Sequence, residues 1–295
     1  HPLYSVLVKE LDRVQDCLID ASNTELNFLK VSRRAGLRVL ISGKMWMTHD
    51  QPGAIVPDSA RRTSRDKLAL SFWIQIPKHN YDDAEIPDGS IKKRRVICIR
   101  AHGIPSKNNP DEKEYIFYPA VFLNYENAKG TKSACIEFVI STCVGGTYAD
   151  NKLISSTQLE QGKWAHVICT YGSNGGNDMS IYIDGGLCGR KKTSGEFVWS
   201  SARPLHVGAP KSSVFPDACD AVRSLCAETS FCGWISDLCH FDEGVEDDDI
   251  PSLSKLPSPN AIKLKIDADN YSYRLVSFAL EIVQSDAGRV GLVDN

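Results

Sequence analysis

The chain has 295 residues, of which 42% are hydrophobic and 24% charged, and its formal net charge is −3. This composition is ordinary for a globular chain, and the small net charge gives no electrostatic reason to expect nucleic acid as a general partner. No apolar run approaches the roughly 20 residues of a membrane-spanning helix. The length allows one large β domain with added helices, or two modest domains.

The first segment, residues 1–36, is predicted to be helical. Apolar residues recur at helical spacing over Leu3–Leu18, as on one face of an amphipathic helix. A second helix is predicted after the capping sequence NTE at 23–25, and it ends near Ala35 because Gly36 follows. We expect this segment to pack on its own domain or on a neighbouring one.

From residue 37 the chain is predicted to form short strands separated by polar loops. The predicted strands are 37–47, 67–76, 94–101, 115–125, 134–142, 164–171, 179–183, 204–208, 231–241 and 260–265. A strand or short loop is expected around 152–159, a short helix over 218–225, and a short turn or helix over 242–254. The pattern of 271–285 leaves helix and strand open. Many strands at short spacing with few internal helices favour an antiparallel sandwich.

The stretch 162–189 is the clearest strand pair, with a turn rich in glycine and asparagine between its two strands. On the first strand Trp164, His166, Ile168 and Thr170 fall on one face. The residues between them, which fall on the other face, are Ala165, Val167, Cys169 and Tyr171. Both faces carry apolar side chains, so this pair is predicted to lie inside a two-layer structure.

Aromatic and histidine side chains are interpreted mainly as core. Trp46, Trp73, Trp164 and Trp234 are expected to be buried, and Trp199, beside two serines in a loop, is the one expected to reach a ligand. His166 is interpreted as a histidine of the core or of a sheet face, with its hydrogen bonds satisfied.

Five pieces of sequence follow one another in a recognisable order: KLALSFWIQI, GKWAHVICTY, MSIYIDGG, PLHVG and FCGWISDLCHF. They resemble the concanavalin A-like jelly roll, and most closely its laminin-G and pentraxin-like branch. The residues that carry the resemblance are Trp73, Gly162, Trp164, His166, Val167, Tyr182, Asp184, Gly185, Val207, Gly208, Phe231, Gly233, Ile235 and Asp237.

The resemblance covers about 66–253 and implies an all-β fold, a concanavalin A-like antiparallel β-sandwich with N-terminal helices and a C-terminal extension. The expected domains are a helical segment over 1–36, the sandwich over 37–256, and a strand or helix extension over 257–295 that packs on the sandwich. Similar sandwiches occur inside large intracellular proteins of the BEACH type or the HECT ubiquitin-ligase type.

Ten cysteines bear on the cellular compartment. Several, such as Cys98 and Cys169, lie in predicted strands among apolar residues, where a free thiol behaves as a small hydrophobe. The later set, from Cys219 to Cys239, lacks the short CxxC pairs of common zinc sites. Free thiols in a reducing compartment are the preferred interpretation, with disulfides and a metal site as the alternatives.

Catalytic residues are predicted to be absent. Glycosidases of the superfamily carry close carboxylates on one strand, and no predicted strand here has such a triplet. Glu137 and Asp237 are isolated acids on separate strands. The acidic run over 242–249 is interpreted as a solvated cap, with a calcium site as the alternative. We therefore expect no catalytic, cofactor or metal residues and no cofactor.

Ligand contacts are expected at the rim of the sandwich. Laminin-G-like and pentraxin-like domains often bind calcium there, and Asp150-Asn151 and Asn174–Asp178 are the matching stretches, although turn chemistry explains both. The residues named as candidate ligand contacts are Trp199, Asn174 and Asp178.

The expected function is a non-catalytic interaction or scaffolding module, a fragment of a larger intracellular, cytoplasmic protein. Its partner would be a protein or a neighbouring domain of the same chain, with no nucleic acid and no membrane span. The main alternative is a carbohydrate-binding lectin module that binds a glycan, with or without calcium, and an extracellular location goes with it. A glycoside hydrolase that has lost or moved its carboxylates is a third option.

The thiol interpretation predicts a simple mass measurement. Alkylation of the denatured, unreduced protein should add close to ten adducts, one for each cysteine of the sequence. Two or more protected pairs would place the protein in an oxidising compartment instead.

Overall fold

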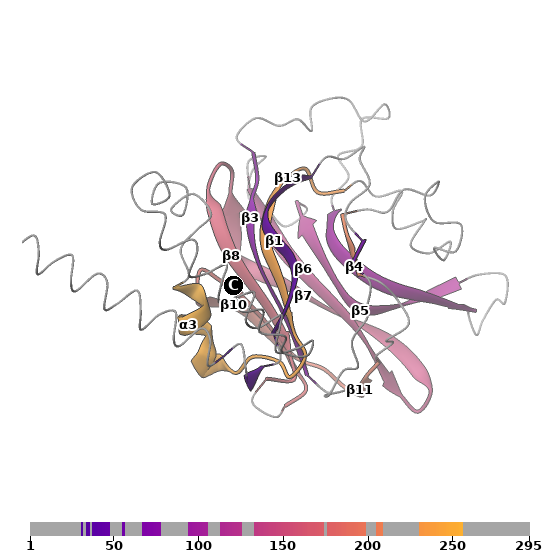
Figure 1. Cartoon of the computed structure of the whole chain (residues 1–295). Helices are drawn as coiled ribbons and strands as arrows, with labels where there is room; N and C mark the ends of the chain where they lie inside the picture. The colour runs from indigo at the N-terminus through magenta and orange to yellow at the C-terminus, as the bar shows by residue number, and fades with distance from the viewer. Residues whose placement is uncertain are drawn as a thin grey trace, which may run out of the picture.

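The computed structural model of this protein describes residues 31, 34–35, 37–47, 55–56, 67–77, 94–105, 113–125, 133–173, 176–198, 205–208 and 230–255. Over these residues the chain forms a two-layer β-sandwich with a short helical turn after its last strand (Figure 1). The predicted helix over 3–18, the strand over 260–265 and the segment 271–285 lie outside the described residues.

In the part of the chain that the structure describes, the first sheet has six strands, and each pairs antiparallel with its neighbour. In spatial order they are β1 (Leu37–Met47), β13 (Gly233–Phe241), β3 (Leu68–Gln75), β8 (Trp164–Tyr171), β9 (Asp178–Ile183) and β10 (Gly186–Lys192).

The second sheet has seven strands among the described residues. In spatial order they are β11 (Glu196–Phe197), β6 (Ser133–Val144), β5 (Lys113–Asn124), β4 (Arg94–Pro105), β12 (Leu205–Val207) and β2 (Ile55–Val56), with β7 (Thr147–Glu160) also paired to β6. The 3₁₀ turn η3 (Asp247–Asp249) and the helix α3 (Ile250–Ser254) follow β13.

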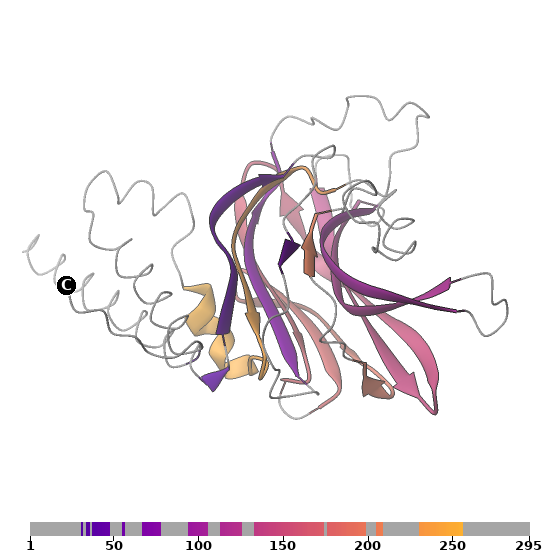
Figure 2. The ribbon, with the colours of Figure 1, turned by 45° about the vertical axis from the view of Figure 1, so that its right-hand side comes forward.

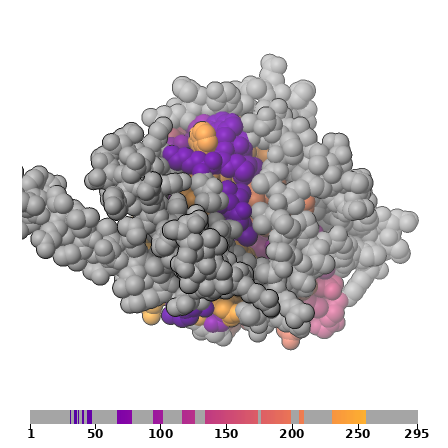
Figure 3. Space-filling view, in the orientation of Figure 1, coloured from indigo at the N-terminus to yellow at the C-terminus, as the bar shows by residue number. Residues whose placement is uncertain are grey.

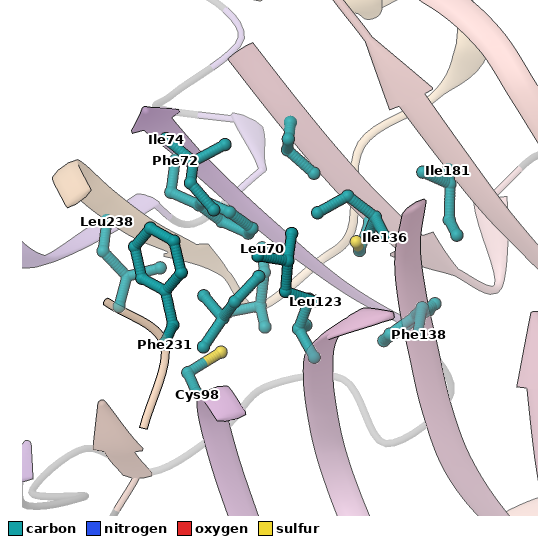
Figure 4. Close-up of a cluster of buried hydrophobic side chains, with 14 of the residues drawn as sticks. Leu70, Phe72, Ile74, Cys98, Leu123, Ile136, Phe138, Ile181, Phe231 and Leu238 are labelled. Atoms are coloured by element: carbon teal, nitrogen blue, oxygen red, sulfur yellow. The ribbon is translucent and has the colours of Figure 1, made fainter. Parts of the chain in front are cut away.

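The core lies between the sheets and depends on the alternation of β3 and β8. These strands pair without a register shift from Leu68 opposite Tyr171 to Gln75 opposite Trp164. Every second residue of each strand therefore faces the second sheet. Figure 4 shows side chains from both sheets meeting there: Leu70, Phe72, Ile74, Cys98, Leu123, Ile136, Phe138, Ile181, Phe231 and Leu238.

Each sheet also buries apolar side chains on its outer face. On the first sheet these side chains form one cluster with the chain's own flanks, Val31 and Ala35 before β1 and Ile250 and Leu253 in α3. Figure 2 shows α3 on the side of the first sheet that faces away from the second sheet. On the outer face of the second sheet a separate cluster includes Val96, Ile99, Ala101, Phe117, Ala120, Phe122 and Val139. The two-sided burial predicted for the strand pair of 162–189 is confirmed for β8.

The all-β sandwich is confirmed, and most predicted strands are present within a few residues of their expected bounds. Three strands were missed, and β7 is longer than expected. The strand β10, with the sequence GLCGRKK, has two glycines and three cations. It lies at the edge of its sheet, where backbone pairing alone makes the strand and no apolar alternation is required. The predicted division into three domains stays a prediction.

The core pattern predicts the cost of truncating a central side chain. Phe72 of β3 is fully buried between the sheets, so Phe72→Ala should lower the free energy of unfolding by about 3–5 kcal/mol. Leu187→Ala is the matched control, because Leu187 is 52% exposed at the edge strand β10. Equal denaturation midpoints for the two variants would contradict the assignment of the core.

Candidate functional site

Of the three predicted ligand contacts, the structure describes Asp178 and does not bring it together with the other two. Trp199 and Asn174 lie outside the described residues. Asp178 begins β9 as a half-buried residue, and its backbone carbonyl accepts a hydrogen bond from the amide of Gly172 at 3.1 Å. The structure thus gives Asp178 a turn role, and its contact with a ligand stays a prediction.

The two isolated acids do not meet. Glu137 is on β6, where Arg94 lies 2.9 Å away as an ion-pair partner and the amide of Asn124 donates a 2.7 Å hydrogen bond. Only 3% of the Glu137 side chain is exposed. Asp237 is on β13 in the other sheet and accepts a hydrogen bond from Ser236 at 2.7 Å. A glycosidase needs two carboxyl groups facing one groove, and these two lie in different sheets.

The acidic run after β13 is bound by cations, which corrects its interpretation as a solvated cap. Lys67 Nζ lies 2.8 Å from Glu246 Oε1, and Arg190 lies 2.5 Å from Asp247 Oδ2. Arg34 pairs with Asp249. Among the residues that the structure describes, no three histidine, cysteine, aspartate or glutamate side chains come together in a way that could hold a metal ion.

Thiols are free at every cysteine position that the structure describes. They are Cys98, Cys135, Cys143, Cys169, Cys188, Cys232 and Cys239. Burial raises the pKa of Cys98 to about 12, so this thiol stays protonated and unreactive at neutral pH.

Three tryptophans form a row across the outer face of the first sheet. Trp46 of β1 is opposite Trp234 of β13, Trp234 is opposite Gln75 of β3, and Gln75 is opposite Trp164 of β8. We call these four residues the tryptophan row. All four side chains are half-buried, so they are neither core nor fully exposed.

The tryptophan rings of the row contact one another and Lys44, and they keep part of their surface exposed to solvent. The rings of Trp46 and Trp234 meet edge to face, with centroids 4.9 Å apart and planes at 63°. Lys44, an exposed residue of β1, places its ammonium 5.6 Å from the ring centroid of Trp164, within the range of a cation–π contact. The indole nitrogen of Trp164 is buried, and none of the described residues accepts a hydrogen bond from it. In Figure 3, violet atoms of the early strands and orange atoms of the β13 region reach the surface among the grey atoms.

The tryptophan row corrects the expectation that these side chains are core. Trp73 is buried, with 8% of its surface exposed, but the three tryptophans of the row are not. Polar neighbours on the same strand face do not predict this difference, because Trp73 shares its face with Ser71 and Gln75 and is buried all the same. Trp164 shares its face with His166 and Thr170, while the core residues occupy the alternate positions.

His166 lies next to the tryptophan row, and one of its two ring nitrogens has a hydrogen-bond partner among the described residues. Its Nε2 is 2.8 Å from the hydroxyl of Ser71, and its ring lies 4.9 Å from that of Trp73. Its Nδ1 is buried, and within the part of the chain that the structure describes it has no hydrogen-bond partner. Burial lowers the pKa of His166 to about 4, so the ring is neutral at physiological pH.

Two antiparallel sheets of six and seven strands with a shared core define a sandwich of the lectin-like jelly-roll class. A comparison with protein families agrees with this geometry. The model described as the concanavalin A-like lectin/glucanases superfamily matches residues 50–223, and the chain belongs to that superfamily. No curated protein sequence matches the chain.

Solved structures with a similar fold are distant in sequence. The heptameric SAP-like pentraxin from Limulus polyphemus is 14% identical, with 74% of this chain and 82% of that chain covered and a TM-score of 0.42. The binding domain of botulinum neurotoxin serotype D is also 14% identical, with 74% and 45% covered and a TM-score of 0.41. This chain thus spans less than half of that toxin domain.

A third similar structure is the CBM40 of the Ruminococcus gnavus IT-sialidase, bound to α2,3 sialyllactose. It is 6% identical, with 74% of this chain and 100% of that chain covered and a TM-score of 0.42. Similarities at this level concern the fold alone. None of the described helices is long and apolar enough to cross a membrane.

The buried neutral His166 predicts a pH dependence of stability. An unfolded histidine has a pKa of about 6.5, so on acidification the unfolded state takes up a proton before the folded state does. The free energy of unfolding should therefore fall from about pH 6.5 to about pH 4, by up to roughly 3 kcal/mol, and then level off. Urea denaturation of the wild type and of His166→Gln at several pH values measures this.

The difference in free energy of unfolding between the wild type and His166→Gln should shrink as the pH falls. Burial also lowers the pKa of His206, so His206 contributes to the pH dependence of the free energy of unfolding with the same sign. His206→Gln is therefore the control that shows how much of the slope comes from His206. A wild-type slope that His166→Gln leaves unchanged would show that His166 is not the group responsible.

Proposed function

We propose that this protein is a non-catalytic interaction module that docks a protein, or a neighbouring domain of its own chain, through the tryptophan row. The observation that carries the proposal is the placement of three half-buried tryptophans in one row with Gln75 on an outer sheet face. Tryptophan is enriched among residues that dominate binding energy at interfaces, because it provides a large contact area with few rotatable bonds.

A polypeptide with few charges suits this face better than a highly charged partner. The tryptophan row itself carries no charge, and Lys44 is the cation beside it. The same sheet face already accepts polypeptide, since Val31, Ala35, Ile250 and Leu253 pack against it. A non-catalytic role is supported by Glu137, which is buried in an ion pair on the opposite sheet.

The proposed setting is a larger intracellular, cytoplasmic protein, of the kind in which BEACH-type or HECT-type parents carry such sandwiches. The free thiols of the described cysteines support this setting, because reducing compartments keep cysteines free.

A lectin role is the second candidate, and a specific observation favours it. Aromatic faces stack on the apolar faces of sugar rings, and the half-buried tryptophans of the row offer such faces. The rim residues Trp199, Asn174 and Asp178 remain the predicted contacts for such a ligand.

Substitution of the tryptophan row tests the proposal. Binding partners captured from source-cell lysate by the wild-type protein should be lost with Trp46→Ala and Trp234→Ala, and kept with Tyr148→Ala. Tyr148 is the matched control because it is an aromatic residue, 37% exposed, on β7 of the other sheet. A captured partner is then purified, and its affinity by calorimetry should fall at least about 10-fold for each tryptophan variant, as expected for hot-spot residues.

Glycan-array binding with and without EDTA separates the two candidates. Glycan binding that both tryptophan substitutions abolish, with no protein partner dependent on the row, would replace the docking role by the lectin role. Partners that bind both tryptophan variants and the wild type equally would refute docking through the row.

A further inference from the structure

The acidic segment after β13 is held by three cations that come from three different parts of the chain. Lys67 precedes β3, Arg190 is on β10, and Arg34 precedes β1. Their partners are Glu246, Asp247 and Asp249, respectively. We call these six residues the acidic clasp.

Tyr182 adds a neutral donor to the acidic clasp. Its hydroxyl lies 2.5 Å from Asp247 Oδ1, and Arg190 donates to the same hydroxyl at 2.9 Å. Burial, with a further contribution from Asp247, raises the pKa of Tyr182, so the hydroxyl keeps its proton and can donate.

An apolar contact lies beside the acidic clasp. Ile250 and Leu253 are three residues apart in α3, so they share one side of the turn. Both are buried in the cluster that contains Ala69, Ile168 and Phe241 of the first sheet. Figure 2 shows α3 on the outer side of that sheet. We call Lys67, Arg190, Tyr182, Ala69, Ile168 and Phe241 the receptor patch.

Two of the ion pairs that hold the segment on the receptor patch are partly exposed, although Ile250 and Leu253 are themselves buried. The side chains of the Lys67–Glu246 pair are 31% and 33% exposed, and those of the Arg190–Asp247 pair are 37% and 34% exposed. Ion pairs with this much solvent contact contribute little. The helix α3 has five residues, which is too short to be stable by itself. The strands beneath it have their own ladders, so the segment can open locally while the sandwich stays folded.

We propose that the receptor patch is a docking site for a partner protein's acidic segment, and that residues 246–254 occupy it in cis. The charge complement defines the partner: two or three carboxylates within one turn, followed by two apolar side chains three residues apart. Such a segment would displace the chain's own segment and make the same ion pairs. This site lies on the same sheet face as the tryptophan row, and it does not depend on the tryptophans.

A peptide competition experiment tests the proposal. The probe is a fluorescein-labelled peptide with the sequence of residues 244–255, GVEDDDIPSLSK. The full chain is compared with a double variant, Asp247→Asn with Leu253→Ala, which weakens the segment in cis and leaves the receptor patch intact. Fluorescence anisotropy should give the variant an apparent affinity at least about 10-fold higher, because affinity rises with the fraction of open sites.

Control variants assign the binding to the receptor patch. Adding Arg190→Glu to the double variant should abolish binding, while adding Trp46→Ala should leave the affinity within about twofold, because the two sites are separate. A peptide with lysine at all four acidic positions should not bind. Raising the salt concentration from about 0.05 M to about 0.5 M should weaken binding of the acidic peptide, because exposed charges are screened.

Hydrogen exchange of the wild type covers the case in which the double variant does not fold. The amides of Ile250 and Ser252–Ser254 should exchange at least about 10-fold faster than those of β13, as a local opening requires. Equal exchange in the two segments would overturn the proposal, as would a folded double variant that does not bind the peptide. A concentration-dependent dimer of the variant, with exchange of this segment between copies, would make a second copy the occupant and also overturn it.

Discussion

The antiparallel pairing of β3 with β8 is the constraint on which the rest of the structure depends. Both strands lie in the middle of the first sheet, and their register has no shift along its length. Because a shift of one residue would exchange the two faces, this register decides which side chains enter the core. It also decides that Trp164 and His166 face outward together.

Charged side chains are used in two different ways in the two sheets. The Arg94–Glu137 pair is withdrawn from solvent and is completed by the amide of Asn124. Removing either partner would leave a buried charge uncompensated, which is costly. Two ion pairs of the acidic clasp, Lys67–Glu246 and Arg190–Asp247, have side chains that are 31% to 37% exposed, so each of these two can break at a small cost. The Arg94–Glu137 pair holds strands of the second sheet together, whereas the ion pairs of the acidic clasp suit a contact that opens.

The outer face of the first sheet combines two kinds of polypeptide contact. One part carries the tryptophan row, and another part is covered by the chain's own flanks, which meet there through Val31, Ala35 and α3. The amide of Glu243 donates to the carbonyl of Ala35 at 3.1 Å, so the chain enters and leaves the sandwich at neighbouring points. A module with adjacent entry and exit points is easily accommodated within a longer chain.

The sequence by itself determined the all-β class, most strands and the core face of β8, because alternation of apolar residues is a local property of each strand. It also carried the superfamily motifs. It could not place Trp46, Trp234, Gln75 and Trp164 in one row, because that row depends on registers between strands far apart in the chain. The cations that bind Glu246, Asp247 and Asp249 were hidden for the same reason. Only the tertiary structure brings such distant residues together, since the pairing of charges depends on distance in space and not on separation in sequence.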